Sequence, residues 1–274
     1  MEAARVFLSL PFRTEKTEEE HPECLSVFDS RHMNRFFEAL REEVSSAAAD
    51  TDGLQVVEIV LGNGSAAHLT ADDLSGTVRL IRQMLPVSPH AAVRLTVTPA
   101  GFDFYKLSAV KQLQNASIRF ELPGLTEERL QAGGYRCTPE KAYQALECCF
   151  QNGFRDFSVF LTAADMPEEE AEATLTKLLA VHPEAILLRS DAEERFVQQV
   201  DRILTGEHWT RSGNNWYRDA VPETPRCSIQ LGLGPGAASV FDGTGVRSTC
   251  DFDFYCDHAG DFEALVRHAE TEED

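Results

Sequence analysis

The chain has 274 residues, 43% of them apolar, which is enough to bury the core of a single barrel-sized domain. Its 25 Lys and Arg residues against 45 Asp and Glu residues give a formal net charge of −20, and so acidic a surface repels nucleic-acid backbones and anionic lipid headgroups. Its seven cysteines are odd in number and lack Cys-x2-Cys spacing, so we expect reduced thiols and neither a zinc ribbon nor a disulfide framework. No apolar run approaches the ~20 residues that span a bilayer, and the N-terminus has no pattern typical of export, so we expect a cytoplasmic protein.

Short apolar runs typical of buried strands alternate with stretches of helical periodicity along the chain. The first helix begins near Arg31 and has Met33, Phe36, Phe37, Leu40 and Val44 on one face. The predicted strands are Arg5–Leu10, Gln55–Leu61, Val93–Thr98, Ser117–Leu122, Asp156–Thr162, Ala185–Arg189 and Ser228–Leu233.

Two later helices have recognisable ends. Thr138-Pro139-Glu140 places an N-cap residue before a first-turn proline, and this helix is expected to end at Gly153. A further helix carries Phe196, Val197, Val200, Ile203 and Leu204 on one face, with Asp191 and Glu194 spaced as a capping box and Gly206 as its end.

Repeated strand–helix units imply parallel strands joined by right-handed crossovers. About six such units favour an α/β fold with an open, partial barrel, forming one domain over residues 1–274. Ligands then belong at the carboxyl ends of the strands, and the acidic tail, residues 269–274, is expected to fray.

The end of the first strand carries the most informative motif. Leu10-Pro11-Phe12 leads into Arg13-Thr14-Glu15-Lys16-Thr17-Glu18-Glu19-Glu20. This arrangement resembles the radical S-adenosylmethionine (SAM) enzymes of the oxygen-independent coproporphyrinogen III oxidase and haem-chaperone type, which have a partial (β/α)6 TIM-like barrel. In that family Pro-Phe is followed by Cys-x3-Cys-x2-Cys, whose positions fall here on Arg13, Thr17 and Glu20, none of which binds iron as a thiolate.

The resemblance extends to other turns. Gly62-Asn63-Gly64-Ser65-Ala66-Ala67 corresponds to the family's Gly-Gly-Gly-Thr-Pro-Ser turn near the amino-acid end of SAM, and Leu231-Gly232-Leu233-Gly234-Pro235-Gly236-Ala237 closely matches its Gly-x-Gly-Pro-Gly-Ala turn. Thr98 stands where the family has a ligand-positioning glutamate, Gly133–Cys137 replaces its Leu-Gly-Arg-x-His segment, and Phe160 replaces an aspartate. We expect the family's C-terminal accessory domain to have no counterpart in this chain. The residues predicted to bind a ligand, through backbone groups, are Gly62, Asn63, Gly64, Ser65, Thr98, Gly234, Pro235 and Gly236.

Because the thiolates are missing, the sequence predicts no iron–sulfur cluster, no other metal and no catalytic residues at these positions. Arg13 would place a fixed positive charge there, favouring a carboxylate or phosphate ligand, and a salt bridge to Glu15 or Glu20 is the alternative. SAM and haem are left open as ligands, with His68 or Cys137 as an axial haem ligand and ordinary packed residues as the alternative for both.

Two functions are compatible with these residues. The preferred hypothesis is a catalytically inactive scaffold that binds a tetrapyrrole, a nucleoside-like ligand or an active paralogue. The alternative is a working enzyme of porphyrin metabolism, a coproporphyrinogen III oxidase-like oxidoreductase. Gly-x-Ser-x-Gly, His-Glu-x-x-His and Walker motifs are absent from the sequence. Self-association is a further expectation, because the missing accessory domain would leave an apolar face to cover.

Overall fold

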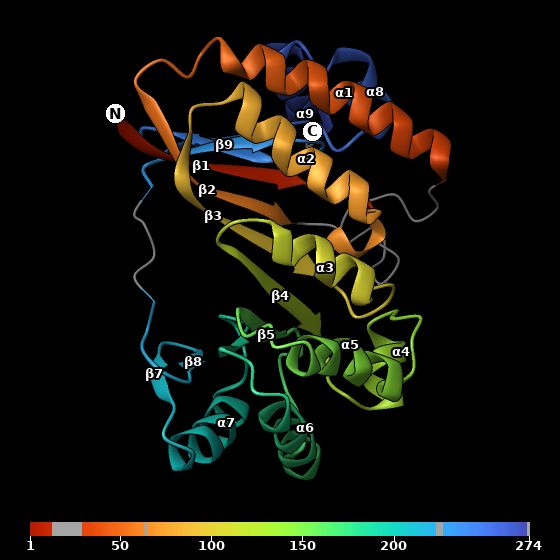
Figure 1. Ribbon diagram of the computed structural model, residues 1–274, viewed down its shortest axis with the longest axis vertical. Helices are drawn as coiled ribbons and strands as arrows, with labels where there is room; N and C mark the ends of the chain where they lie inside the picture. Colours follow the sequence, from red (N-terminus) through yellow and green to blue (C-terminus); the bar gives the residue numbers. More distant parts are fainter. Residues whose placement is uncertain (13–28, 63–64, 223–226, 273–274) are drawn as a thin grey trace. The chain divides into compact units, whose positions relative to one another are not determined.

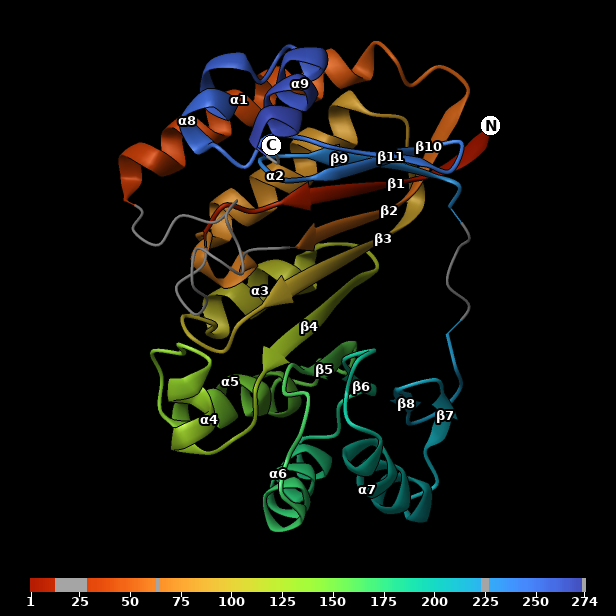
Figure 2. The ribbon, with the colours of Figure 1, turned by 180° about the vertical axis from the view of Figure 1, so that it is seen from behind.

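The computed structural model describes residues 1–12, 29–62, 65–222 and 227–272, which form two compact α/β units. Unit 1 consists of Met1–Thr96, Gln112–Ala116 and Pro225–Asp274, and unit 2 of Val97–Lys111 and Ser117–Thr224. Figure 1 and Figure 2 draw the chain from opposite sides.

Unit 1 is built on strands in the order β11-β10-β9-β1-β2-β3. Strand β1 pairs in parallel with β2 and β9, β2 pairs in parallel with β3, and β10 is antiparallel to both of its neighbours. These strands are β1 (Glu2–Ser9), β2 (Leu54–Gly62), β3 (Val87–Val97), β9 (Ile229–Leu233), β10 (Ala238–Phe241) and β11 (Thr244–Arg247).

The helices of unit 1 pack through a core of aromatic side chains. Phe36 contacts Phe12 and Tyr255, with ring centroids 5.3 and 6.3 Å apart, and all three rings are buried. Both ribbon views show α8 and α9 beside α1 (Figure 1, Figure 2). The helices are α1 (Ser30–Ala48), the 3-10 turn η1 (Ala66–His68), α2 (Ala71–Met84), α8 (Phe252–His258) and α9 (Phe262–Glu272).

A buried carboxylate ties three of these strands together. The Glu58 side chain on β2 is 1% exposed and forms ion pairs with Arg5 on β1, at 2.5 Å, and with Arg94 on β3, at 2.8 Å. Because a charge in the interior is stabilised only when it is paired, Glu58 depends on both arginines.

Unit 2 contains strands in the order β4-β5-β6-β8-β7, with β4, β5 and β6 parallel and β8 antiparallel to β6 and β7. The indole of Trp216 on β8 is fully buried and donates a 2.9 Å hydrogen bond to Asp201 on α7. The elements are α3 (Phe104–Gln112), β4 (Ala116–Leu122), α4 (Glu127–Ala132), α5 (Pro139–Gln151), β5 (Phe157–Leu161), α6 (Glu168–Ala180), β6 (Ala185–Leu188), α7 (Glu194–Gly206), β7 (Thr210–Ser212) and β8 (Asn215–Tyr217).

The predicted strands are confirmed, and so is the N-cap Thr138. The hairpins β7–β8 and β10–β11 were not predicted, and α9 continues to Glu272, through part of the tail expected to fray. The predicted capping box of α7 is wrong. Asp191 forms two hydrogen bonds with the Arg189 guanidinium, at 2.7 and 2.6 Å, and the N-cap position is Glu193, whose side chain makes no capping bond.

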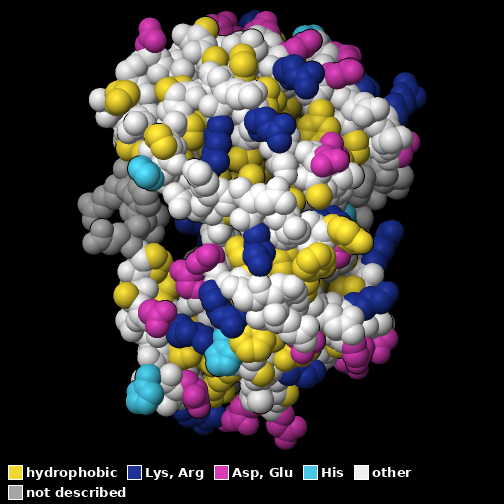
Figure 3. Space-filling model, in the orientation of Figure 1, with side chains coloured by type: hydrophobic (Ala, Val, Ile, Leu, Met, Phe, Trp, Pro, Cys, Tyr) yellow, Lys and Arg dark blue, Asp and Glu magenta, His cyan; other side chains and the backbone are white. Residues whose placement is uncertain are grey.

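The surface of the described residues mixes both charges. Figure 3 shows acidic, basic and hydrophobic side chains interspersed over one face. No helix within the described ranges is long and apolar enough to cross a membrane.

Candidate functional site

The carboxyl ends of β1 and β2 lie side by side in unit 1, where the sequence predicts a ligand. The backbone N–H of Leu10 donates to the Gly62 carbonyl at 3.0 Å, and the N–H of Ser65 donates to the Phe12 carbonyl at 2.9 Å. A Cβ atom on Gly62 would lie 2.8 Å from the Phe7 ring, so the absent side chain makes room for packing. Arg13, Thr17, Glu20, Asn63 and Gly64 lie outside the described residues.

Ser65 begins the short turn η1. Its side chain is buried, and its hydroxyl accepts a 3.2 Å hydrogen bond from the Ala67 N–H. The backbone of Ser65 thus joins the end of β1, while its hydroxyl caps the next turn. Its predicted role in ligand binding stays a prediction.

The glycine-rich turn after β9 is held against two other strands. Gly234 has φ +88°, and a Cβ atom there would lie 2.3 Å from the Ser9 carbonyl oxygen at the end of β1. On Gly232 a Cβ atom would lie 2.6 Å from the Ala238 carbonyl oxygen. Gly236 has φ +68° and donates its N–H to the Thr249 carbonyl at 2.7 Å. Gly234, Pro235 and Gly236 are all buried. The close backbone approach at Gly234 and the positive φ of Gly234 and Gly236 account for these two glycines without a ligand.

A buried glutamate on α1 contacts the same turn. The Glu43 carboxylate accepts hydrogen bonds from the Gly234 N–H and the Tyr255 hydroxyl, both at 2.8 Å. Burial raises the pKa of Glu43 to about 7, against the opposing effect of these two hydrogen bonds. Burial and the neighbouring Glu43 also raise the pKa of Tyr255 well above its ordinary value. Sequence reasoning missed Glu43, whose only signal was a glutamate three residues after Leu40 on an apolar helix face.

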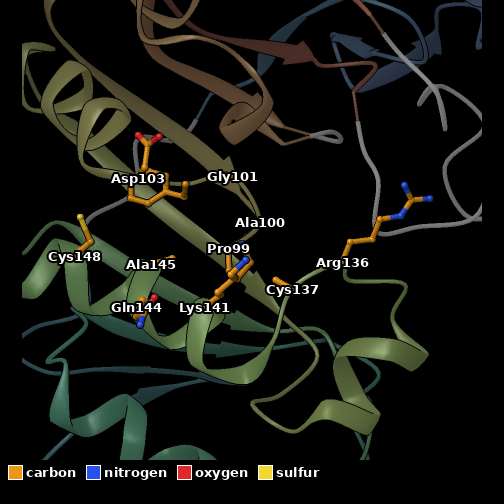
Figure 4. A pocket seen from close by; sticks show the side chains of 11 residues that line it. Pro99, Ala100, Gly101, Asp103, Arg136, Cys137, Lys141, Gln144, Ala145 and Cys148 are labelled. Carbon is orange, nitrogen blue, oxygen red and sulfur yellow. The ribbon is translucent and has the colours of Figure 1, made fainter.

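Thr98 belongs to unit 2, where it is fully buried directly after β3. The loop that follows forms one wall of a pocket of about 390 Å³, and the other wall comes from α5 and the segment before it. Figure 4 shows Asp103 and Cys148 on one side of this pocket, while the Arg136 side chain extends away from them. The lining residues are Pro99, Ala100, Gly101, Phe102, Asp103, Arg136, Cys137, Lys141, Gln144, Ala145 and Cys148.

Cys148, Cys149, Cys227 and Cys256 are free cysteines. Burial raises the pKa of Cys148, which lines the pocket, and of Cys149 beside it. Burial likewise raises the pKa of Cys227, and that of Cys256 to about 11. In the absence of a metal ion these four thiols therefore stay protonated near neutral pH. Over the described part of the chain, no three His, Cys, Asp or Glu side chains are grouped so that they could hold a metal ion.

We compared this architecture with solved structures. Coproporphyrinogen III oxidase (HemN) from Escherichia coli, a radical SAM enzyme, superposes with a TM-score of 0.79 at 13% identity, over 97% of this chain and 70% of that one. The radical SAM methyltransferase TsrM from Kitasatospora setae gives a TM-score of 0.35 at 16% identity, over 53% of this chain and 28% of that one, a likeness too low to carry an argument. No protein-family model and no curated protein sequence matches the chain.

The chain therefore has a radical-SAM-like α/β fold, a partial TIM-like barrel with mostly parallel strands. At 13% identity the likeness to HemN concerns the fold alone.

Proposed function

We propose that this protein is a catalytically inactive scaffold of the radical SAM type, which keeps a binding site for a small molecule or a partner protein. The proposal rests on the side chains at the three positions where the family binds its iron–sulfur cluster. Arg13, Thr17 and Glu20 supply a guanidinium, a hydroxyl and a carboxylate where the resemblance requires three thiolates. The iron–sulfur cluster that the fold family implies therefore does not fit these residues.

The described thiols do not offer an obvious replacement. Over residues 1–12, 29–62, 65–222 and 227–272, no three Cys, His, Asp or Glu side chains are grouped so that they could hold a metal ion. The free thiols of Cys148, Cys149, Cys227 and Cys256 also fit a protein that acts in a reducing compartment such as the cytoplasm.

Two features support ligand binding by the inactive scaffold. The backbone hydrogen bond from Ser65 to Phe12 joins the segment after β2 to the segment after β1. Backbone groups of both segments therefore lie at the carboxyl ends of the strands, where ligands bind in this kind of fold. Unit 2 separately holds the pocket beside α5. A tetrapyrrole or a nucleoside-like molecule is the proposed ligand, and an active paralogue is the proposed partner. For haem, His68 and Cys137 are the side chains we propose as axial ligands.

Anaerobic reconstitution with iron and sulfide tests the loss of the cluster. We expect the natural protein to stay colourless after desalting, with less than one iron per chain. The matched control is the triple variant Arg13→Cys, Thr17→Cys, Glu20→Cys, which should gain brown colour and bound iron if the alignment of these positions is right. Four irons and four sulfides on the natural protein would overturn the proposal in favour of an active coproporphyrinogen III oxidase-like enzyme.

Calorimetric titration then identifies the ligand. Haem and SAM are titrated separately into the natural protein and into His68→Ala and Cys137→Ala, with His90→Ala, on β3, as the control. Haem binding that is weakened by one of the first two substitutions, and not by the third, supports a tetrapyrrole site. Heat from neither ligand would contradict both small-molecule assignments and leave the partner role to be tested by pull-down with an active paralogue.

A further inference from the structure

Two arginine side chains and a histidine gather at the end of unit 2 opposite to the carboxyl ends of its parallel strands. Arg155 comes two residues before β5 and His182 three residues before β6. Arg218 follows β8, which is antiparallel to β6, so it reaches the same edge. The three side chains therefore meet at the amino ends of β5 and β6, away from the edge where the fold places its ligands.

The three side chains form one continuous set of contacts with two aromatic rings. The Arg155 guanidinium lies 4.5 Å from the centroid of the Phe150 ring, and His182 stacks on Phe150 at 5.1 Å. The Arg218 Nη1 group lies 2.5 Å from His182 Nδ1, and its guanidinium lies 5.5 Å from the centroid of Trp209. We call Arg155, His182 and Arg218, with the rings of Phe150 and Trp209, the cationic cluster.

The two guanidiniums have no carboxylate partner within the described residues. Arg155 donates to the Phe150 carbonyl at 2.9 Å, and Arg218 donates to His182. Asp219 is close enough to favour the charged form of Arg218, but no ion pair joins Arg155 or Arg218 to a described acidic residue. This is unusual in a chain where acidic residues outnumber basic ones by 45 to 25.

The positive charges of Arg155 and Arg218 repel each other within the cationic cluster. Burial, followed by the charges of Arg218 and Arg155, lowers the pKa of His182. Burial also lowers the pKa of Arg218, and Arg155 lowers it further. Because Arg218 donates to His182 Nδ1, the imidazole is neutral in this arrangement. An anion bound between the guanidiniums would relieve the repulsion and raise the pKa of His182.

The cluster is also reachable. Arg155 and His182 are exposed, Arg218 is partly exposed, and the rings beneath them are more buried. The net charge of the whole chain does not prevent anion binding here, because interactions between exposed charges more than about 8 Å apart are largely screened at physiological salt.

We infer that the cationic cluster of Arg155, His182 and Arg218 is a binding site for a phosphoryl group. A guanidinium donates two parallel hydrogen bonds to phosphate oxygens, and two guanidiniums match the double negative charge of a phosphate monoester better than the single charge of a carboxylate. Both arginines are held by stacking on aromatic rings, which reduces the entropy lost when they bind. The phosphoryl group could belong to a small metabolite or to a phosphorylated side chain, and the two sources share this chemistry.

Phenyl phosphate is the probe for the first test, with the His182 imidazole resonance followed by NMR across a pH series. We expect added phenyl phosphate to raise the pKa of His182, and we expect Arg155→Gln to weaken binding about tenfold. Arg218→Gln should weaken it similarly, and Arg155→Gln keeps the test valid if Arg218→Gln misfolds, because Arg155 is exposed. The matched control is Arg195→Gln, an exposed arginine at the start of α7, which should bind as the natural protein does.

Three results would overturn the inference. The first is an unchanged His182 pKa at saturating phenyl phosphate. The second is equal affinity of the natural protein and Arg155→Gln, and the third is an acetate effect as large as that of phosphate. Inorganic phosphate and a peptide with one phosphoserine distinguish the sources: tighter binding of the peptide than of phenyl phosphate identifies a protein-borne phosphoryl group, and the reverse identifies a small molecule. The test involves neither the positions Arg13, Thr17 and Glu20 nor the carboxyl ends of the strands. It can therefore fail or succeed independently of the proposed loss of catalysis.

Discussion

The buried Glu43 carboxyl makes the stability of the protein depend on pH. Its pKa is raised from an ordinary 4.5 to about 7 in the folded protein, because burial disfavours the charged form. The folded state then holds a proton that the unfolded state releases, so the free energy of unfolding is highest below pH 4.5 and falls as the pH rises towards 7. A shift of this size corresponds to about 3 kcal/mol in total, of which roughly 2 kcal/mol falls between about pH 5.5 and pH 8.

The substitution Glu43→Gln isolates this contribution. Glutamine keeps an oxygen that accepts from the Gly234 N–H and the Tyr255 hydroxyl but cannot ionise, so the variant should lose about 2 kcal/mol of the pH-dependent decline between about pH 5.5 and pH 8. Urea unfolding followed by tryptophan fluorescence measures this at several pH values, all above the sequence pI of about 4.8. The control is Glu38→Gln, on the exposed face of α1. Parallel pH profiles for the natural protein and Glu43→Gln would refute the reasoning.

Three further predictions concern packing and buried polar groups, each measured by chemical unfolding. Gly234→Ala should destabilise the fold by about 2–4 kcal/mol, because the added Cβ atom would lie 2.3 Å from the Ser9 carbonyl oxygen. The control is Gly243→Ala, where φ is +78° but nothing lies within 4 Å of the added Cβ atom, and it should cost only about 1 kcal/mol. Equal losses would contradict the steric argument. Glu58→Ala leaves two arginines, 29% and 31% exposed, without their carboxylate and should cost about 2–3 kcal/mol. Trp216→Phe removes the hydrogen bond to Asp201 and should cost about 2 kcal/mol; a loss below about 0.5 kcal/mol would show that the bond contributes little.

Strand β6 was predictable because it is buried on both faces. Strand β6 reads Ala185-Ile186-Leu187-Leu188, and all four residues are buried, which gives a continuous apolar run in the sequence. The hairpin β7–β8 has no such signal, since Thr210–Ser212 is exposed throughout. The capping box failed for a different reason: Asp191 had a closer partner, the Arg189 guanidinium, two residues away.

The candidate site was less predictable, because its contacts are long-range. Glu43 meets Gly234 across 191 residues of sequence and Tyr255 across 212, and no local pattern encodes these pairs. The motif Gly234-Pro235-Gly236 was found because a glycine-rich turn is visible in the sequence, but its partner Ser9 was not. The cationic cluster was missed for the same reason, since Arg155, His182 and Arg218 are distant along the chain and meet only through the order of the strands.

The turn after β9 separates two kinds of information that a sequence motif can carry. With only 2.3 Å between the Ser9 carbonyl oxygen and the place of a methyl group on Gly234, any chain that brings these two strand ends together in this way will select glycine there. Such a match reports the architecture of the barrel, and an enzyme and its non-catalytic descendant would share it alike. A search for activity within this fold should therefore give more weight to the presence or absence of cysteines after the first strand than to the glycines after β9.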